Sequence, residues 1–481
     1  MLLPNQFDDC LAVNDNIVIM TSWLPDLAAQ RGPRYRAIAE ALAEDVRSGV
    51  LPPGARLPTH RDLAWRLKVT VGTVSRAYAE AERRGLIAGE VGRGTFVRAA
   101  ATAPALRFDG EPQGDDVVDL GVHRPRAASE AKLLAEALAS LAGDPDLPQL
   151  MEYQPHAGRA AERAAGAAWI ERSGGLATTD EQVVVTASGQ HAIAAILASI
   201  AEPGDALAVE ALTYPGIRAA ASLLHLKLVP LALDEHGVLP EALAASCRAG
   251  RVRALYTLPT LHNPTTATMP AERRRALAEV ARRHEVMLIE DDVYGFLLER
   301  PLPPLAALAP EHAFYITATS KSLVPGLRVG YAHCPPALVD GVTAAVRAMT
   351  YTAPPLMARI ASRWIEDGTA DRLVREKRAE IARRQQVVQR LFAQQNYRMA
   401  PGAAHLWLML PEPWHGEAFA AAARQRGVAI APAAAFAVGR QTPRAARICI
   451  GTPPSLAALE RGLTRLAELL AAAPEAYLSV V

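Results

Sequence analysis

The sequence contains few cysteines, and each stands alone. Four of the 481 residues are cysteine, namely Cys10, Cys247, Cys334 and Cys449. No pair shows Cys-x-x-Cys spacing, and no histidine stands beside one at metal-ligand spacing. The sequence therefore indicates neither a disulfide framework nor a zinc site. We expect reduced thiols in a cytoplasmic protein that binds no metal.

Other absences narrow the class of protein further. No apolar run approaches the ~18 residues of a membrane-spanning helix. The first residues lack the basic and apolar regions of a signal peptide, and no internal repeat is visible. A formal net charge of +1 excludes a chain that is polybasic as a whole. At 481 residues the chain is too long for one hydrophobic core, so we expect at least two domains.

Positive charge is concentrated near the N-terminus. Residues 20–98 contain 13 Lys and Arg against 8 Asp and Glu, whereas the rest of the chain is slightly acidic. A basic module on a neutral or acidic body is typical of a DNA-binding domain joined to a partner domain. A chance excess of solvated arginines would give the same surplus.

Composition and periodicity divide the chain into four segments. Residues 1–19 show no clear period and are interpreted as a disordered leader, with a short arm packed on the body as the alternative. Residues 20–98 form the basic unit. Residues 99–116, rich in Ala, Pro, Gly and acids, predict a linker. In residues 117–481, short apolar runs alternate with helical stretches, which predicts an α/β domain.

The basic unit shows helices with signals that begin and end them. Residues 35–48 carry apolar side chains at helical spacing. Thr59 can cap a short helix around 62–68, because Asp62 follows three residues later. Thr70 follows a tight turn and can cap the next helix, at about 71–84. Two short helices around a tight turn predict a helix-turn-helix.

The second of these helices has one apolar and one polar face. Its apolar face carries Val71, Val74, Tyr78 and Ala81, and its opposite face carries Thr73, Arg76, Glu80 and Arg83. Such a polar face can enter a DNA major groove. Residues 91–97 predict a hairpin wing, from which Arg93 can reach the DNA backbone or minor groove. A plain three-helix module with solvated arginines would show the same pattern.

Three strings in this unit resemble one family. RLPTHRDLA (56–64), VTVGTVSRAY (69–78) and GRGTFV (92–97) resemble the GntR family of winged helices, over nearly all of residues 34–97. The resemblance implies double-stranded DNA as a partner and places these residues at the DNA: Arg34, Arg56, Thr59, Arg61, Thr70, Thr73, Arg76, Arg93 and Gly94. Relatives often carry larger polar residues at the positions of Gly72 and Thr73, which implies few direct base contacts there.

In the α/β segment, predicted strands end in groups that bind anions or cations. Strand 182–186 leads through Ser188 into a helix, whose first N–H groups attract an anion. Strand 286–290 leads into Glu290-Asp291-Asp292, at the strand end where open α/β sheets bind ligands. Three successive acids are costly to bury unless a positive group faces them.

Further strand ends carry aromatic, amide and amine side chains. Tyr214 and Asn263 follow two predicted strands. Lys321 follows a third, with Ser320 before it and Arg328 seven residues on. A lysine that forms a Schiff base, an acid for a pyridinium nitrogen and an anion cradle are what pyridoxal phosphate (PLP) requires. A lone lysine would more often be a solvated surface residue, so the ordered set carries the prediction.

The ordered set resembles the class I aminotransferase fold in the motifs SGQ, TYPG, HNPT, EDDVYG and SKSLVPGLRVGY. With the winged helix in front, the chain after Met20 resembles the MocR subgroup of GntR regulators. The resemblance implies an α/β fold class: a winged helix-turn-helix plus the PLP-dependent transferase fold type I. That fold has a mostly parallel central sheet in an α/β sandwich and a smaller C-terminal α+β part. The resemblance also implies a homodimer and an operator with two half-sites.

The resemblance assigns roles residue by residue. Lys321 forms the Schiff base, Asp291 pairs with the pyridine nitrogen, and Arg447 holds the carboxylate of an amino compound, with Arg444 as its rival. The other cofactor-binding residues are Tyr294 and Asn263 at the ring hydroxyl, Tyr214 stacked on the ring, and Ser188, Gly189, Gln190, Ser320 and Arg328 at the phosphate. Tyr153 reaches the phosphate of the other subunit or serves in packing.

Two positions depart from the family pattern. Relatives usually carry Ser or Thr three residues before the lysine, where this chain has Ala318. One phosphate hydroxyl is therefore missing, with Thr317 or Thr319 as replacements. Relatives that are working transaminases often have Gly where this chain has Thr266.

Three functions are compatible with the sequence. The first is a regulator in which an amino compound displaces Lys321 to form an external aldimine and thereby alters DNA binding. The second is an aminotransferase, with an amino acid donor and a 2-oxo acid acceptor, that has an accessory DNA-binding domain. The third is a scaffold that only brings two DNA-binding modules together. The complete PLP set argues against the third, and the intact winged helix argues against a pure enzyme.

Overall fold

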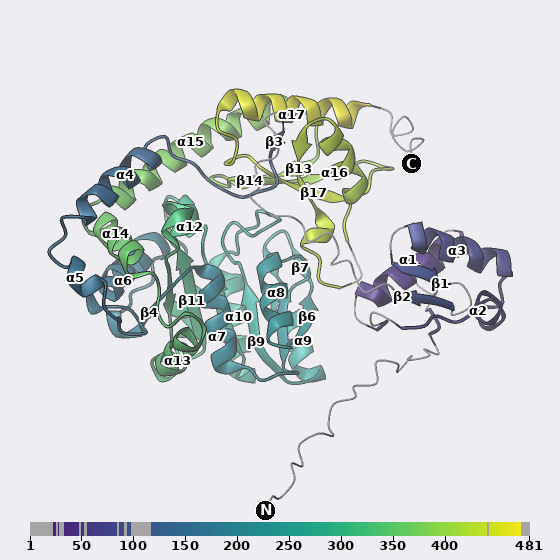
Figure 1. Ribbon diagram of the computed structural model, residues 1–481, viewed down its shortest axis with the longest axis horizontal. Coiled ribbons are helices and arrows are strands. Elements are labelled where there is room, and N and C mark those ends of the chain that lie inside the picture. The colour runs from purple at the N-terminus through teal and green to yellow at the C-terminus, as the bar shows by residue number, and fades with distance from the viewer. Residues whose placement is uncertain are drawn as a thin grey trace, which may run out of the picture. The chain divides into compact units, whose positions relative to one another are not determined.

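The computed structural model describes residues 23–25, 27, 33–47, 50–51, 55–83, 86–90, 94–97, 117–439 and 442–472. The chain divides into two compact units, Met1–Arg107 and Phe108–Val481 (Figure 1). The predicted leader (1–19), the predicted linker (99–116) and Arg93 lie outside the described residues.

The first unit consists of helices followed by a hairpin. Its elements are α1 (Arg34–Arg47), α2 (His60–Leu67), α3 (Val71–Arg83), β1 (Ile87–Glu90) and β2 (Gly94–Val97). The strands β1 and β2 pair antiparallel, and the three helices share one apolar core. The predicted winged helix-turn-helix is confirmed.

Short polar side chains begin α2 and α3. The Thr59 hydroxyl accepts a hydrogen bond from the Asp62 N–H at 3.2 Å, and the Thr70 hydroxyl accepts one from the Thr73 N–H at 3.2 Å. The first bond satisfies an N–H at the helix start, where the backbone offers no acceptor within the helix. The Thr73 N–H also donates to Thr70 O at 3.0 Å.

The apolar face of α3 differs from the predicted one. Its buried residues are Val74, Ala77, Tyr78 and Ala81, which follow the i, i+3, i+4, i+7 spacing of one helix face. Val71, which the sequence assigned to the apolar face, is 45% exposed and does not join the buried residues. Val71 is the first residue of α3, and Ala77 takes the fourth position of the buried face instead.

The second unit is built on a large sheet. Its strands are β4 (Val183–Thr186), β5 (Ala206–Glu210), β6 (Lys227–Leu231), β9 (Val252–Thr257), β10 (Met287–Asp291), β11 (Ala313–Ala318) and β12 (Gly330–His333). Their order is β4-β12-β11-β10-β9-β5-β6. All run parallel except β12, which pairs antiparallel with β11 and β4. The predicted, mostly parallel sheet is confirmed.

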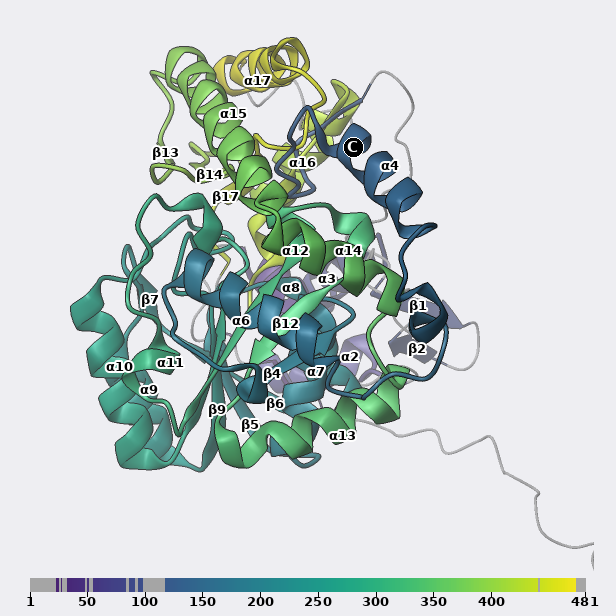
Figure 2. The same cartoon turned by 90° about the vertical axis from the view of Figure 1, so that its left-hand side faces the viewer.

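Helices cover both faces of this sheet (Figures 1 and 2). The helices in this part of the chain are α4 (Glu130–Leu141), α5 (Leu147–Leu150), α6 (Ala160–Gly174), α7 (Gly189–Ile200), α8 (Pro215–Leu223), α9 (Pro240–Ala249), α10 (Ala271–His284), α11 (Leu305–Leu308), α12 (Thr319–Ser322), α13 (Val339–Thr350) and α14 (Pro355–Glu366). On one face, α6 packs so closely on β12 that a Cβ at Gly166 would lie 2.4 Å from Tyr331. On the other face, the start of α7 faces Ile316 and Ala318 of β11.

A smaller C-terminal part has its own sheet and core. Its elements are α15 (Thr369–Leu391), β13 (Tyr397–Arg398), β14 (His405–Met409), α16 (Gly416–Gln425), β15 (Val428–Ala429), β16 (Ala431–Pro432), β17 (Ala445–Cys449) and α17 (Leu456–Ala471). Strands β13, β14, β17 and β16 form an antiparallel sheet. The short strand β3 (Val118–Asp119) pairs with β15, so the first described residues of the second unit pack into this C-terminal core.

Two minor strands, β7 (Leu233–Asp234) and β8 (Gly237–Val238), form a ribbon. No helix among the described residues is both long enough and apolar enough to cross a membrane. Within the same residues, no group of three His, Cys, Asp or Glu side chains is arranged to hold a metal ion.

Candidate functional site

The predicted cofactor residues come from five strand ends at one edge of the large sheet. Because parallel strands share the edge at which they end, the residues after β4, β5, β9, β10 and β11 converge there. These are Ser188 to Gln190, Tyr214, Asn263, Asp291 with Tyr294, and Ser320 with Lys321. The structure brings together groups that lie up to 133 residues apart in the chain between Ser188 and Lys321.

The three successive acids at the end of β10 have different partners. Glu290 forms a buried ion pair with Arg274 of α10, at 3.1 Å between Nη1 and Oε1. Asp292 accepts a hydrogen bond from the Tyr315 hydroxyl at 2.7 Å. Both lie toward the α10 side, whereas Asp291 points to the opposite face of the sheet, as alternation along a strand requires. The sequence predicted a single positive partner for the acids and missed Arg274.

Asp291 retains an unused acceptor. Its Oδ2 accepts a hydrogen bond from the Tyr256 hydroxyl at 2.6 Å, and its buried Oδ1 has no partner. Burial raises the pKa of Asp291 to about 7, although the Tyr256 hydrogen bond opposes this shift. A cationic ring nitrogen placed at Oδ1 would supply the missing partner and stabilise the ionised carboxylate. The donor set of this acid therefore fits the pyridinium nitrogen of PLP.

Lys321 is half-buried on α12, immediately after β11. Its Nζ donates a hydrogen bond to the backbone oxygen of His123. Burial lowers the pKa of the Lys321 amine to about 8, an effect that Arg447 and Lys377 reinforce. A lysine with this pKa has a substantial neutral, nucleophilic fraction near neutral pH, which attack on an aldehyde requires.

The pH dependence of cofactor uptake follows from this pKa. Only the neutral amine attacks, so the uptake rate is expected to rise from pH 7 and level off above about pH 8, where most of the Lys321 amine is neutral. Stopped-flow absorbance after mixing the cofactor-free protein with PLP measures the rate. A rate that climbs steadily toward pH 10.5, the ordinary lysine value, would contradict a lowered pKa.

The start of α7 provides an anion cradle. The Ser188 hydroxyl accepts a hydrogen bond from the His191 N–H at 3.1 Å, and Gly189 and Gln190 form the first turn. The N–H groups of a first turn have no acceptor within the helix and carry partial positive charge. Gln190 also donates to Gly216 O at 2.9 Å, which orients its amide beside Tyr214. Arg328 is exposed after a turn, in a left-handed conformation with φ 51°.

Thr317 and Thr319 are the two candidates to replace the hydroxyl that relatives carry at position 318. Ala318 faces the cradle, with its Cβ 3.6 Å from the position of a Cβ at Gly189. Thr317 pairs with Tyr331 and points to the other face of the sheet. Thr319 donates its hydroxyl hydrogen to Val329 O at 3.0 Å. Neither threonine therefore offers a free hydroxyl hydrogen to the cradle in this structure.

Restoring that hydroxyl is expected to strengthen cofactor binding. In Ala318→Ser, a hydroxyl beside the first turn of α7 adds a donor to the phosphate, which is worth about 1 kcal/mol or roughly fivefold in affinity. Titration of the cofactor-free protein with PLP measures the dissociation constant, and Ala318→Gly is the control that alters packing without adding a donor. Equal affinities for the Ser variant and the wild type would show that position 318 does not face the phosphate.

Arg447 of β17 is buried and faces the same edge. Its Nη1 donates to Asn263 Oδ1 at 2.7 Å, its Nη2 donates to Gly121 O at 2.5 Å, and its guanidinium lies 4.7 Å from the Phe436 ring. The buried Nε has no partner. Arg444 instead forms an ion pair with Glu412 at 2.6 Å on the surface. Of the two arginines named from the sequence, only Arg447 lies in the site.

Two histidines lie at this site that the sequence did not reveal as candidate site residues. His123 contacts the Tyr294 ring edge-on at 4.5 Å, and it contacts the ring of His405 at 4.9 Å. Burial keeps the pKa of the Tyr294 phenol above its usual value. His123 stands in an irregular segment and His405 in a short strand, so neither position carried a motif that would have revealed it.

Thr266, the second departure from the family pattern, adopts a left-handed conformation with φ 63°. Glycine reaches this region without steric cost, which accounts for its frequency in relatives at this position. The Thr266 hydroxyl accepts a hydrogen bond from the Ala400 N–H at 3.3 Å, so the threonine gains a contact to the C-terminal part.

The first unit presents most of the predicted DNA contacts on its surface. Arg34, Thr59, Arg61, Thr70 and Arg76 are exposed, and Thr73 is half-buried beside Thr70. Arg56 lies against the wing, because a Cβ at Gly94 would be 2.8 Å from its Nε. Gly94 has φ +119°, which glycine tolerates best. The arrangement gives a polar face on α3 next to a hairpin.

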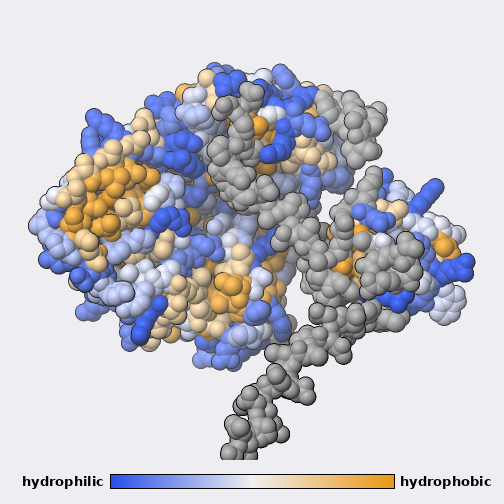
Figure 3. Space-filling view, viewed as in Figure 1, coloured by the Kyte–Doolittle hydropathy of each residue, from blue (hydrophilic) through white to orange (hydrophobic). Residues whose placement is uncertain are grey.

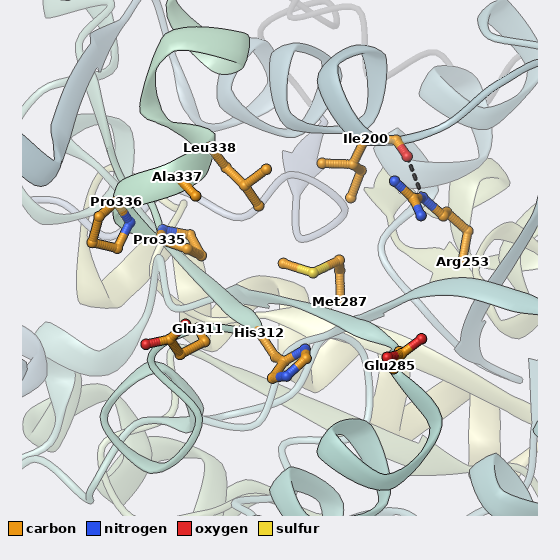
Figure 4. Close-up of a pocket in the computed structure, with 10 residues that line it drawn as sticks. All are labelled: Ile200, Arg253, Glu285, Met287, Glu311, His312, Pro335, Pro336, Ala337 and Leu338. Carbon is orange, nitrogen blue, oxygen red and sulfur yellow. Dashed lines mark hydrogen bonds between the residues drawn. The ribbon is translucent and has the colours of Figure 1, made fainter.

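A separate hollow of about 420 Å³ lies at the opposite edge of the large sheet (Figure 4). Its lining includes Arg253, Met287 and His312, at the amino ends of β9, β10 and β11. Arg253 there donates to Ile200 O. None of the buried, unpartnered side-chain atoms among the described residues belongs to this lining.

Known proteins match both units. Residues 34–97 match the bacterial regulatory proteins of the gntR family, and residues 115–466 match aminotransferase class I and II. The chain is 35% identical to the uncharacterized HTH-type transcriptional regulator YdeF of Bacillus subtilis, over 93% of this chain and 97% of that protein. It is 27% identical to the HTH-type transcriptional regulator TauR of Rhodobacter capsulatus, over 92% of this chain and 97% of that protein.

A solved structure supports the fold of the second unit. LysN, an alpha-aminoadipate aminotransferase from Thermus thermophilus complexed with N-(5'-phosphopyridoxyl)-L-leucine, superimposes with a TM-score of 0.68. The match covers 76% of this chain and 94% of that one at 24% identity. The predicted transferase fold is confirmed.

Proposed function

The chain belongs to the GntR family of bacterial regulators, in the MocR subgroup that carries an aminotransferase class I and II domain. From this premise we propose that an amino compound bound at the PLP site controls the binding of the protein to DNA. The helix-turn-helix unit binds DNA, and PLP is the cofactor of the second unit. One observation supports this function above others. A half-buried lysine, an acid with an unused oxygen and a buried arginine converge in the same chain as a helix-turn-helix with an exposed polar face.

We assign the cofactor-binding roles as follows. Lys321 bonds covalently to PLP, Asp291 pairs with its ring nitrogen, and Arg447 holds the carboxylate of the amino compound. The other residues that hold PLP are Tyr214 on the ring, Asn263 and Tyr294 at the ring hydroxyl, and Ser188, Gly189, Gln190, Ser320 and Arg328 at the phosphate. When bound, PLP supplies an aldehyde carbon that condenses with primary amines.

The segment 117–126, here termed the strap, offers a route from this site toward the DNA-binding unit. Lys321 Nζ donates to the strap at His123 O, Arg447 to Gly121 O, and Lys377 Nζ to Pro125 O at 3.1 Å. A ligand that engages Lys321 and Arg447 competes with two of these bonds. The strap is the first described segment after the DNA-binding unit along the chain, so its release is proposed to transmit ligand binding to that unit.

A homodimer with two DNA-binding units on two half-sites is part of the proposal. Apolar side chains are exposed on the second unit and gather over α4 and α14 in Figure 3. The exposed large side chains in this part of the chain are Leu138, Met151, Tyr153, Met349, Tyr351 and Leu356. Tyr153 is 86% exposed, and its ring lies 5.1 Å from the Tyr351 ring in a tilted arrangement. A contiguous exposed apolar area on a globular protein typically marks an interface.

A charge within this area is expected to weaken the dimer. Met151 is 78% exposed, so Met151→Glu leaves the fold intact but would bury a carboxylate in the interface, which is expected to raise the dimer dissociation constant at least tenfold. Sedimentation equilibrium measures this constant. Leu223→Glu on α8, at a 72% exposed position, is the matched control. An unchanged constant for Met151→Glu would place the interface elsewhere.

Aminotransferase activity is the second candidate function, because Lys321, Asp291 and Arg447 are all present in one site. Conversion of an amino donor and a 2-oxo acid by the PLP-loaded protein would support it. Regulation and turnover use the same residues, so this measurement adds an activity without excluding the first.

DNA selectivity tests the proposed function. Fluorescence anisotropy of the purified protein on its own upstream DNA, against a scrambled duplex at equal salt, separates sequence recognition from phosphate binding. Non-specific binding alone reaches about 10⁻⁶ M. We expect affinity for the upstream DNA at least a hundredfold above that for the scrambled duplex. Equal affinities, with and without PLP, would contradict a regulator and favour the enzyme.

A further inference from the structure

The His123 side chain lies between the groups that are proposed to hold an amino compound. Its backbone oxygen accepts the Lys321 hydrogen bond, and its ring contacts Tyr294 and His405. Lys321 bonds to the His123 backbone, and Arg447 bonds to Gly121 two residues before it, so both cations lie near the ring. A ligand that extends from Arg447 to Lys321 therefore passes beside this imidazole.

The histidine pair carries unused hydrogen-bonding atoms. His123 is 5% exposed, and neither of its ring nitrogens has a hydrogen-bond partner. His405 is 1% exposed, and its Nδ1 also lacks a partner. Leaving a buried polar atom unpaired costs stability, so a native structure that does so repeatedly at one place calls for an explanation. A polar ligand group at this place provides one.

Both rings are neutral at physiological pH. Burial lowers the pKa of His405 to about 3 and holds that of His123 well below its usual value, and nearby Arg447 acts in the same direction on both. His405 Nε2 lies 3.1 Å from the carbonyl oxygen of His262, so this nitrogen carries the proton and Nδ1 is an acceptor. A neutral His123 adds one donor and one acceptor.

The unpaired ring nitrogens of His123 and His405 favour one class of ligand side chain. One donor and two acceptors are satisfied by a neutral group that both donates and accepts, such as a hydroxyl or a carboxamide. A second ammonium would be repelled by Lys321 and Arg447, and a carboxylate could not donate to the His405 acceptor. An aliphatic side chain would leave every one of these atoms unpaired, which a polar pocket rejects strongly.

We propose that His123 and His405 form the specificity pocket of the site, and that the effector is an α-amino acid whose side chain ends in a hydroxyl or a carboxamide. This inference rests on the proposed function, in which Lys321 and Arg447 receive the amino and carboxylate groups. His123 is the residue that reads the side chain, while His405 is fixed by its bond to the His262 backbone.

Isosteric amino acids test the inference on the full-length, PLP-loaded protein. L-Threonine is compared with L-valine, and L-asparagine with L-leucine, L-aspartate and L-ornithine. Dissociation constants come from the absorbance change of the bound cofactor, and DNA anisotropy provides a readout that is independent of turnover. We expect threonine or asparagine to bind at least tenfold more tightly than its aliphatic isostere and than aspartate or ornithine.

Variants of His123 locate the source of this preference. His123→Phe retains a ring but no donor or acceptor, so it is expected to reduce the preference to within about threefold while valine and leucine bind as before. His123→Gln retains a donor and an acceptor and is expected to preserve the preference. His312→Phe, in the hollow at the opposite edge of the sheet, is the matched control. PLP content is measured for every variant.

The possible outcomes distinguish a failure of this inference from a failure of the proposed function on which it rests. Equal binding of isosteres by the wild type, tighter binding of aspartate or ornithine, or an undiminished preference in His123→Phe would overturn the inference and leave the proposed function standing. If no amino acid of any class changes either the absorbance or the DNA affinity, the proposed function itself is contradicted, and the inference with it.

Discussion

Replacing Lys321 with alanine is expected to abolish both covalent retention of PLP and the response of DNA binding to amino compounds. Lys321 is the proposed amine of the site, and its lowered pKa of about 8 favours it as the nucleophile there. Without it, PLP is held only by noncovalent contacts and should be lost on gel filtration. Bound cofactor should therefore fall from near one per chain to near zero, as measured by absorbance.

A second variant separates the amine from the positive charge. Lys321→Arg retains a donor for His123 O but cannot react with an aldehyde at neutral pH. We expect it to lose PLP as the alanine variant does, while DNA affinity in the absence of effector stays within about twofold of wild type for both. A Lys321→Ala protein whose DNA binding still responds to PLP and amines would contradict the role proposed for Lys321. A variant that regulates normally without any such response would favour the scaffold hypothesis.

Removing Arg76 is expected to weaken DNA binding more than any other single change on the winged helix. Arg76 is exposed on the polar face of α3, the helix that a helix-turn-helix places in the major groove. A base contact by arginine is worth about 1–3 kcal/mol, so Arg76→Ala should lower the affinity for the upstream DNA roughly 5- to 150-fold. Anisotropy titrations measure the loss.

The salt dependence of the same variant distinguishes base reading from phosphate binding. If Arg76 contacts a base, affinity for the scrambled duplex changes little, whereas a phosphate contact lowers both affinities and reduces the salt slope by about 1. Arg275→Ala, on the exposed side of α10 in the second unit, is the control and should leave both affinities unchanged. Unaltered binding by Arg76→Ala would show that α3 is not the reading helix.

The sequence was informative wherever a residue's role follows from its position at a strand end or helix start. Lys321, Asp291 and Ser188 each follow a buried strand, so motif order alone brought them to one edge of the sheet. Thr59 and Thr70 precede helices and cap them. These features depend on local pattern, which one sequence contains.

Partners from distant parts of the chain could not be predicted in this way. Tyr256 donates to Asp291 from a neighbouring strand, and Arg274 neutralises Glu290 from a helix. Both pairings depend on the order of strands in the sheet and on which face each side chain takes. The strap is a further case, because β3 joins the C-terminal strand β15 across 309 residues, from Asp119 to Val428.

The histidine pair shows the same limit at the site itself. His123 and His405 lie in segments without a recognisable motif, and their significance comes from burial and from unpaired ring nitrogens. Val71 shows a different limit: periodicity assigned it to the apolar face of the helix, but burial on that face begins one turn later, at Val74.

The central claim is that occupancy of the PLP site by an amino compound controls DNA binding. The most direct test is the dissociation constant of the PLP-loaded protein for its upstream DNA, measured by anisotropy with and without an amino acid that saturates the cofactor absorbance change. Coupling between two sites typically amounts to 5- to 150-fold, and we predict a change of at least fivefold that is absent in Lys321→Ala. An unchanged constant, with absorbance proving that the amino acid is bound, would contradict the account.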